Sequence, residues 1–280
     1  MKIGFFDSGL GGLTVLKEAI KNEKLKGEIY YLGDNKNTPY GIKNKDFVKM
    51  VVEDNIKTLV EYGCNPIVIA CNTATSLCIK SLREKYKDII FIGTEPAVKV
   101  AADAYTHKKI LVLATSITVK QEKLLNLIDK LGISDCVELV AADKLVKFAE
   151  DVNCSNLKKE IYNYIEKLLS KYDLKKFSHI VLGCTHFPLF YDEFKYIINK
   201  LYPNCDNINI VDGAKGISNN LIKNIKNVDK TYDNLKDLRV HIIMTKPSEE
   251  FKIRTKQILD LPKPSRRTRT CRSPSVMSSA

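Results

Sequence analysis

Residues Ile180–His186 read IVLGCTH, an aliphatic run that meets a glycine and then a cysteine, a threonine and a histidine. The same order recurs in IVIACNT, residues Ile67–Thr73, where three aliphatic residues and one small residue precede Cys71. Short aliphatic runs of this kind are typical of buried strands in a parallel sheet. Two strands that end alike predict two similar structural units.

A second pair of segments supports this repeat. IGFFDS, residues Ile3–Ser8, and ILVLATS, residues Ile110–Ser116, are both apolar runs that end in polar residues. The spacing to the following cysteine is also similar, 64 residues from Asp7 to Cys71 and 69 from Thr115 to Cys184. Ligands bind at the carboxyl ends of strands in open parallel sheets. We therefore expect an active site between two facing lobes, with one cysteine on each side of the ligand.

The rest of the chain alternates β-branched runs with charged, amphipathic stretches such as 43–62 and 158–172. This alternation is typical of helices that cover parallel sheets. The predicted fold class is α/β, with two similar lobes, each a mostly parallel sheet flanked by helices. Residues 1–95 and 207–261 are predicted to form a first, discontinuous lobe, residues 96–206 the second, and residues 262–280 a disordered basic tail. The expected strands are Ile3–Phe6, Ile29–Leu32, Ile67–Ala70, Ile89–Ile92, Ile110–Leu113, Val137–Val140, Ile180–Leu182, Ile208–Val211 and Val240–Met244.

The composition is that of a globular protein, with 44% apolar and 28% charged residues among 280. No apolar run approaches the roughly 20 residues that cross a bilayer, and the N-terminus lacks signal-peptide features, so we expect a cytoplasmic location. The net charge of +12 is spread over many lysines outside the tail, which argues against nucleic-acid binding. Eight scattered cysteines predict reduced thiols and no metal site.

Cys71 and Cys184 admit three interpretations. A free cysteine at a strand end is most often a small buried hydrophobe. Cys184 with His186 has the composition of a nucleophile and its base, as in a cysteine hydrolase. Two equivalent cysteines on facing lobes instead suit racemisation or epimerisation, in which a proton leaves one face of a carbon and another arrives at the opposite face. A thiol, with a reference pKa of about 8.5, is suited to act as base or acid near neutral pH.

Two loops at the predicted sheet edge carry further candidates. FDSGLGGLT, residues Phe6–Thr14, partly matches a dinucleotide-binding loop, with Asp34 about 20 residues on where a ribose-binding acid would lie. Asp7 would repel a pyrophosphate and the third glycine is missing, so we expect no cofactor. GDNKNTPYG, residues 33–41, has strong turn chemistry and makes Tyr40 and Gly41 candidate binding elements.

At this point the chain resembles the glutamate racemases of the cofactor-independent aspartate/glutamate racemase family. The resemblance rests on FDSGLGGLTV, GDNKNTPYG, ACNTATS, LATSITV and GCTHFPL, which span Phe6–Leu189 in this order. It implies two α/β lobes that close on an amino acid, and racemisation of glutamate without pyridoxal phosphate. It also implies a supply of D-glutamate for peptidoglycan, and hence for cell wall biogenesis and cell shape. The expected partners are the small-molecule substrate glutamate and a second copy of the chain in a homodimer, with no membrane.

The resemblance also assigns roles to individual residues. Cys71 and Cys184 would act as thiolate and thiol on opposite faces of the substrate α-carbon, with Asp7 assisting Cys71 and His186 assisting Cys184. The expected substrate-binding residues are Asp7, Ser8, Tyr40, Gly41, Asn72, Thr73, Thr115, Thr118, Thr185 and His186. No metal ligand is expected.

Two departures from the family pattern leave questions open. The segment AADKLVKFAED, residues Ala141–Asp151, differs from the family's usual sequence, which leaves any role for Glu150 undetermined. The basic tail after Leu261 has no counterpart in the family pattern.

Aspartate racemase is the first alternative function within the same chemistry. A cysteine hydrolase that uses Cys184 and His186, and a basic protein that binds through its tail, remain as alternatives from other classes.

Overall fold

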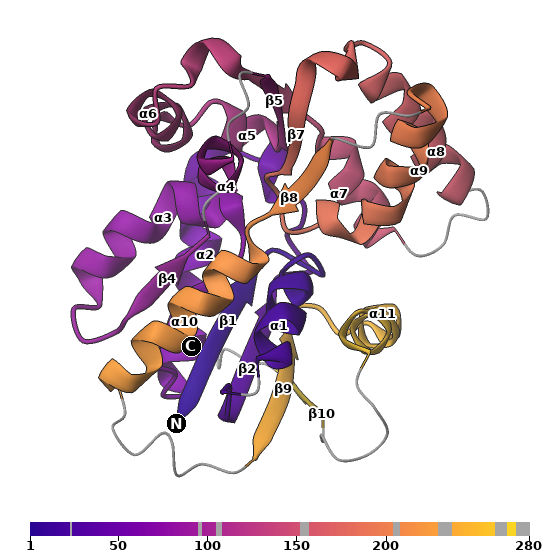
Figure 1. Cartoon of the computed structure of the whole chain (residues 1–280). Coiled ribbons are helices and arrows are strands. Elements are labelled where there is room, and N and C mark those ends of the chain that lie inside the picture. The colour runs from indigo at the N-terminus through magenta and orange to yellow at the C-terminus, as the bar shows by residue number, and fades with distance from the viewer. Residues whose placement is uncertain are drawn as a thin grey trace.

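The computed structural model contains two sheets whose strands all run parallel (Figure 1). The structure describes residues 1–22, 24–94, 97–104, 108–151, 157–203, 208–228, 237–260 and 268–272. The larger sheet has the strand order β10-β9-β2-β1-β3-β4, and the smaller has the order β6-β5-β7-β8. The predicted α/β fold class is confirmed.

The larger sheet is assembled from both ends of the chain. Its strands are β1 (Lys2–Asp7), β2 (Gly27–Gly33), β3 (Ile67–Ile69), β4 (Phe91–Gly93), β9 (Leu238–Met244) and β10 (Thr268–Arg272). β2 pairs with β1 on one side and with β9 on the other, so a strand from the end of the chain extends the N-terminal sheet. The smaller sheet contains β5 (Lys109–Ala114), β6 (Val137–Ala141), β7 (Phe177–Leu182) and β8 (Asn209–Asp212).

Helices cover both faces of each sheet (Figure 1). On the larger sheet, α1 (Gly12–Lys21), α10 (Ala214–Val228) and α11 (Glu249–Leu259) pack on one face, and α2 (Lys45–Glu61) and α3 (Asn72–Lys85) on the other. On the smaller sheet, α7 (Asp143–Glu150), α8 (Leu157–Leu169) and α9 (Tyr191–Leu201) pack on one face, and α4 (Val98–Asp103) and α6 (Glu122–Lys130) on the other. The short elements are α5 (Ser116–Val119), η1 (Tyr40–Ile42), η2 (Ser134–Cys136), η3 (Leu174–Lys176) and η4 (Phe187–Phe190).

The central strand β1 shows why these runs are continuously apolar. Ile3 and Phe5 point into the core under α1, whereas Phe6 points into the core under α2 and α3, and all three are fully buried. Alternate side chains of a strand face opposite sides, so a strand covered on both faces needs apolar residues at every position. The apolar run ends at Asp7, where the strand reaches the edge of the sheet.

Both sheets repeat one topology. The first strand of each sheet, β1 or β5, has the second on one side and the third on the other. Such a reversal of strand order opens a crevice at the carboxyl ends of the first and third strands. Asp7 and Cys71 stand at this crevice in the larger sheet, and Thr115 and Cys184 in the smaller. The repeated sequence pattern therefore corresponds to a repeated strand order.

Several segments bear on the predicted boundaries. Of the range 207–261 assigned to the first lobe, β9 pairs with the larger sheet, whereas β8 pairs with β7 of the smaller one. The division into domains itself stays a prediction. The tail 262–280, predicted as disordered, lies outside the described residues except for β10, which pairs in parallel with β9. In the described part of the chain, each helix is too short or too polar to span a bilayer.

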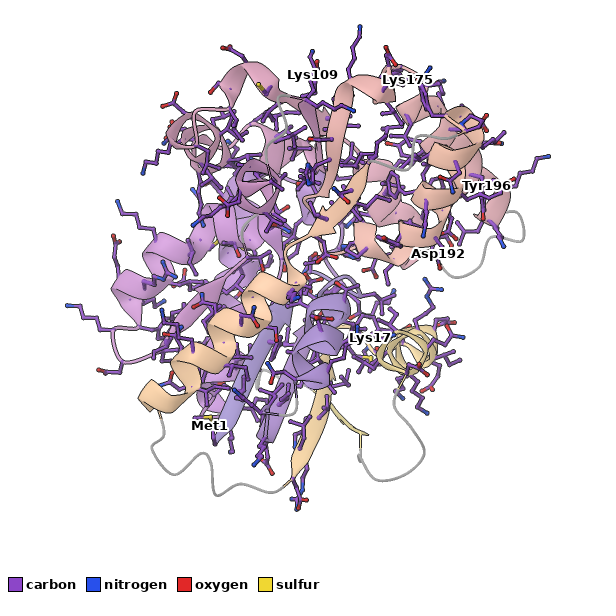
Figure 2. All side chains as sticks on the ribbon, viewed as in Figure 1. Met1, Lys17, Lys109, Lys175, Asp192 and Tyr196 are labelled. Atoms are coloured by element: carbon purple, nitrogen blue, oxygen red, sulfur yellow. The ribbon has the colours of Figure 1, made fainter. Side chains whose placement is uncertain are left out.

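Charged side chains project outward from both halves, as the labelled Lys17, Lys109, Lys175 and Asp192 illustrate (Figure 2). Several described lysines form exposed ion pairs, such as Lys109 with Glu138 and Lys200 with Glu166. Pairs of this kind at the surface contribute little to stability. The positive charge of the described residues is thus dispersed over a solvated surface.

Candidate active site

The two cysteines of the repeat are both buried where the lobes face each other, and each meets a different set of polar groups. Cys71 is 5% exposed and caps the N-terminus of α3, where its Sγ accepts from the backbone N–H of Ala74 at 3.5 Å. Its Sγ lies 3.7 Å from the hydroxyl of Ser8. Burial, the charge of Asp7 and the proximity of Cys184 raise the pKa of the Cys71 thiol, and these effects outweigh the two hydrogen bonds. Cys71 is therefore a neutral thiol near neutral pH.

Cys184 follows β7 and is 6% exposed. Its Sγ lies 3.8 Å from Nδ1 of His186. Burial alone would lower the pKa of His186, but its hydrogen bonds to Cys184 and Glu150 and their charges raise it well above 6.5. The neighbours of His186 thus favour its protonated, cationic form.

Glu150 holds His186 from the other side. The carboxylate Oε1 lies 2.6 Å from Nε2 of His186 and also accepts from the backbone N–H of Leu10 at 2.6 Å. Glu150 ends α7 on the smaller sheet, whereas Leu10 lies in the loop after β1. One carboxylate thus orients the imidazole and ties the two lobes together.

Asp7 makes a second connection between the lobes. This fully buried carboxylate accepts from the backbone N–H of Gly9 at 3.0 Å and from the hydroxyl of Thr185 at 3.0 Å. Burial raises the pKa of Asp7, and the charge of His186 together with these hydrogen bonds opposes the rise. The charge of Asp7 is one cause of the raised pKa of the Cys71 thiol, and the expected assistance of Cys71 by Asp7 stays a prediction.

The glycine-rich loop after β1 serves close packing against the opposite lobe. A Cβ on Gly9 would lie 2.0 Å from Oε1 of Glu150, and one on Gly11 would lie 2.4 Å from Nδ1 of His186. Side chains at these positions would push the second lobe away from Asp7. This packing explains the glycines without a bound dinucleotide.

A chain of hydroxyl groups lines the side of the site near α3 and α5. Thr73 and Thr115 are 3.0 Å apart through their Oγ1 atoms, and Thr115 and Thr118 are 2.9 Å apart. Thr115 also caps α5 by accepting from the backbone N–H of Thr118 at 3.3 Å. All three threonines are buried, and these contacts hold their hydroxyl groups in place.

The predicted binding loop around Tyr40 is anchored by Asp34. The Tyr40 hydroxyl donates to Oδ2 of Asp34 at 2.5 Å, which directs it toward that carboxylate. Gly41 packs against the opposite lobe, since a Cβ there would lie 2.5 Å from Cβ of Thr115. Binding by this loop would therefore involve its backbone.

The structure brings together most of the predicted site residues. Asp7, Ser8, Cys71, Cys184, Thr185 and His186 are linked by the contacts above, and Thr73, Thr115 and Thr118 form an adjoining cluster. Asn72 is buried beside them, and its Oδ1 has no hydrogen-bond partner among the described residues. Within the described ranges, no group of three His, Cys, Asp or Glu side chains has a metal-binding arrangement.

Three carboxylates that form hydrogen bonds in or beside the site were not identified from the sequence pattern. Glu150 was left undetermined because its segment departs from the family pattern. Asp143, which accepts from the backbone N–H of Ser116 at 3.0 Å, carries no motif. Asp34 was considered only as a ribose-binding acid, whereas it anchors the loop of Tyr40. The position of Asp34 directly after β2 was the one sequence signal that could have pointed to this role.

Comparisons with known proteins match this chain to racemases. A family model described as Asp/Glu/Hydantoin racemase matches residues 13–215. A glutamate racemase of Lachnospira eligens is 44% identical over 223 residues, which cover 79% of this chain and 80% of the relative. A glutamate racemase of Halothermothrix orenii is 43% identical over 230 residues, 81% of this chain and 85% of the relative. The crystal structure of a glutamate racemase isoform from Bacillus anthracis has a TM-score of 0.81 at 24% identity, covering 98% of this chain and 97% of that one.

Proposed function

The chain belongs to the Asp/Glu/Hydantoin racemase family, and we propose that it interconverts L-glutamate and D-glutamate by acid/base catalysis between Cys71 and Cys184. The observation that carries this proposal is the pairing of two buried thiols at equivalent strand ends of two facing lobes. Relatives at 43–44% identity that cover about four fifths of the chain are glutamate racemases, which supports glutamate as the substrate.

The surroundings of the two cysteines differ before substrate binds, and we propose that one cysteine reacts as a thiol and the other as a thiolate. Cys71 is held neutral by burial and by Asp7, whereas Cys184 faces the cationic His186. In the proposed step, the thiolate takes the α-proton from one face of glutamate, and the thiol of the other cysteine gives its proton to the opposite face. The C–H bond broken and the C–H bond formed balance, and the two cysteines exchange protonation states.

Removal of an α-proton requires stabilisation of the negative charge that develops next to the carboxylate. Buried donors held in advance provide such stabilisation, because they need not reorganise during the reaction. The hydroxyl groups of Ser8, Thr73, Thr115 and Thr118 are suited to this task, as is the N-terminus of α3 beside Cys71. Asp7 is placed to accept from the substrate ammonium group and to assist Cys71.

The physiological setting follows from the same proposal. We propose that D-glutamate made by this enzyme enters peptidoglycan, that the enzyme works in the cytoplasm without a cofactor, and that it forms a homodimer. These statements rest on the resemblance of the site motifs to those of glutamate racemases.

The reaction is tested by incubating the protein with L-glutamate in D2O. We expect α-proton exchange by NMR and the appearance of D-glutamate, and the absence of both would refute the proposal. Cys71→Ser and Cys184→Ser should each reduce kcat by about three orders of magnitude or more, as expected for loss of an acid/base group that the reaction requires.

Cys78→Ser is the matched control for these variants. Cys78 is also a buried thiol, but it lies on α3 in the core against α2 and away from Asp7. We expect this variant to retain racemisation. A cysteine hydrolase centred on Cys184 and His186 would instead retain its activity in Cys71→Ser, which separates the two readings of the Cys184–His186 pair.

A further inference from the structure

A cavity of about 280 Å³ lies beside Asn72, and most of its lining residues come from α3 on the larger sheet and from α5 and α6 on the smaller one. These three helices lie near one another in Figure 1. Asn72 and Ser76 line it from α3, and Thr118 and Gln121 line it from the other lobe. A water molecule occupies about 30 Å³ in the liquid. A cavity of about 280 Å³ is several times larger, so it has room for a small amino acid.

The cavity adjoins Cys184 through a narrow gap. Asn72 and Thr94 line both the cavity and a gap of about 10 Å³ that reaches Cys184 and Thr185. Asn72 and Thr94 therefore mark the end of the cavity nearest Cys184, whereas Gln121 and Lys130 line the cavity but not the gap. A ligand in the cavity would lie close to Cys71 and Cys184 without contacting them, because neither cysteine lines the cavity.

Two buried polar atoms on the cavity lining lack partners among the described residues. One is Oδ1 of Asn72, a residue that is 6% exposed, and the other is Nε2 of Gln121. A buried donor or acceptor without a partner is costly, because it has lost its hydrogen bonds to water. One is an acceptor and the other a donor, so a ligand with an ammonium group and a carboxylate would satisfy both.

The lining of the cavity is positively charged, which favours binding of a dicarboxylic amino acid. Both charged residues that line the cavity, Lys123 and Lys130, are lysines. We propose that this cavity is an outer binding subsite, at which Gln121 and Lys130 receive a carboxylate of the incoming glutamate before it passes Asn72 to the cysteines. This inference rests on the proposed function and extends it to the route of substrate entry.

A second cavity, of about 790 Å³, also borders the narrow gap, through Thr14 and Asp212. It is a weaker candidate for substrate entry because its lining includes the acids Glu18 and Asp212. Asn72 and Gln121, which carry the two unpartnered buried atoms, also do not line this second cavity. Lys21 lines this second cavity and is exposed, which provides a control of matched charge.

The test compares the kinetics of L-glutamate racemisation in the wild type and in three charge variants. Gln121→Glu replaces the donor by a carboxylate of the same shape, so we expect KM to rise about tenfold with little change in kcat. Lys130→Glu should lower kcat/KM about threefold or more at low salt, and the effect should fade at about 1 M salt, where screening is nearly complete. Lys21→Glu should leave both constants unchanged.

Other outcomes would overturn the inference. An unchanged KM in Gln121→Glu, a loss of kcat at constant KM, or equal effects of Lys130→Glu and Lys21→Glu would each do so. Gln121→Leu, which removes the donor without adding charge, should raise KM less than Gln121→Glu does. Thermal unfolding of each variant identifies one that fails to fold.

Calorimetric titration with L-glutamate separates failure of this inference from failure of the proposed function. An inactive wild type would contradict the racemase proposal, yet weaker binding to Gln121→Glu than to the wild type would still support the subsite. Equal affinities, or no binding to the wild type, would refute it.

Discussion

His186 is the residue whose protonation state is most strongly set by its neighbours. Oε1 of Glu150 lies 2.6 Å from its Nε2, and Sγ of Cys184 lies 3.8 Å from its Nδ1. Burial lowers the pKa of His186, but these two neighbours raise it well above its usual value. A group whose pKa is raised in the folded state adds stability below its unfolded pKa, and that stability is lost as pH rises through the folded pKa. The contribution of His186 is therefore complete below about pH 6.5, its reference value, and declines above it.

Glu150→Gln removes one of the two charges that sustain the imidazolium. We expect the alkaline decline of kcat/KM to move to lower pH, because the imidazolium loses its proton more readily without this carboxylate. The maximum should fall by less than the roughly 100-fold or more that loss of a general acid or base costs. The pH profile of kcat/KM measures both changes. Glu166→Gln removes an acid that pairs with Lys200 far along α8 and should leave the profile unchanged. An unshifted profile in Glu150→Gln would show that this carboxylate does not set the charge of His186.

At the scale of elements, the loop after β1 depends on the absence of side chains. Gly11→Ala would place a Cβ 2.4 Å from Nδ1 of His186, and neither group is a flexible chain end. We expect a loss of about 1–3 kcal/mol in the free energy of unfolding, the usual cost of overpacking, together with reduced kcat. Gly216→Ala is the matched control: nothing lies within 4 Å of its Cβ in α10, so this variant should be neutral or slightly more stable. Denaturant unfolding distinguishes the two.

The loop of residues 34–41 is held by a strand from the far end of the chain. Thr245, just after β9, donates to Oδ1 of the fully buried Asp34 at 2.6 Å, and Asp34 in turn accepts from Tyr40. Thr245→Val keeps the shape but removes this donor, so we expect a loss of about 1–3 kcal/mol in stability. KM for glutamate should also rise, because Gly41 is carried by the same loop. Thr58→Val on the exposed face of α2 should change neither quantity.

The elements that the sequence predicted best are those with local signals. Aliphatic runs that end in polar residues located the strands and placed Asp7, Cys71 and Cys184 at strand ends, because this pattern is carried by adjacent residues. The contact of Glu150 with His186 depends instead on how α7 packs, and no local pattern encodes that. The anchoring of Tyr40 by Asp34 and Thr245 likewise joins residues about 200 positions apart, which a single sequence does not reveal.

At the scale of the whole molecule, the site is completed only when both lobes are in contact. A ligand that binds between them stabilises the folded protein by mass action, by about 2.7 kcal/mol at a concentration of 100 times Kd. We expect L-glutamate and D-glutamate each to raise Tm by roughly 5 °C under these conditions. Thermal scans of the wild type and of Cys71→Ser would check this, and a shift with one enantiomer alone would contradict a shared site.

The hydrogen bonds that cross between the lobes also bear on how this protein can change over generations. Thr185 donates to Asp7, and Leu10 donates to Glu150, so each half completes the polar groups of the other. If the repeat began as a duplication, its two copies are no longer interchangeable. We therefore expect a substitution near Asp7 to require a compatible residue at 150, 185 or 186. Chimaeras that join one half of this chain to the other half of a distant relative should therefore fold more readily than they racemise.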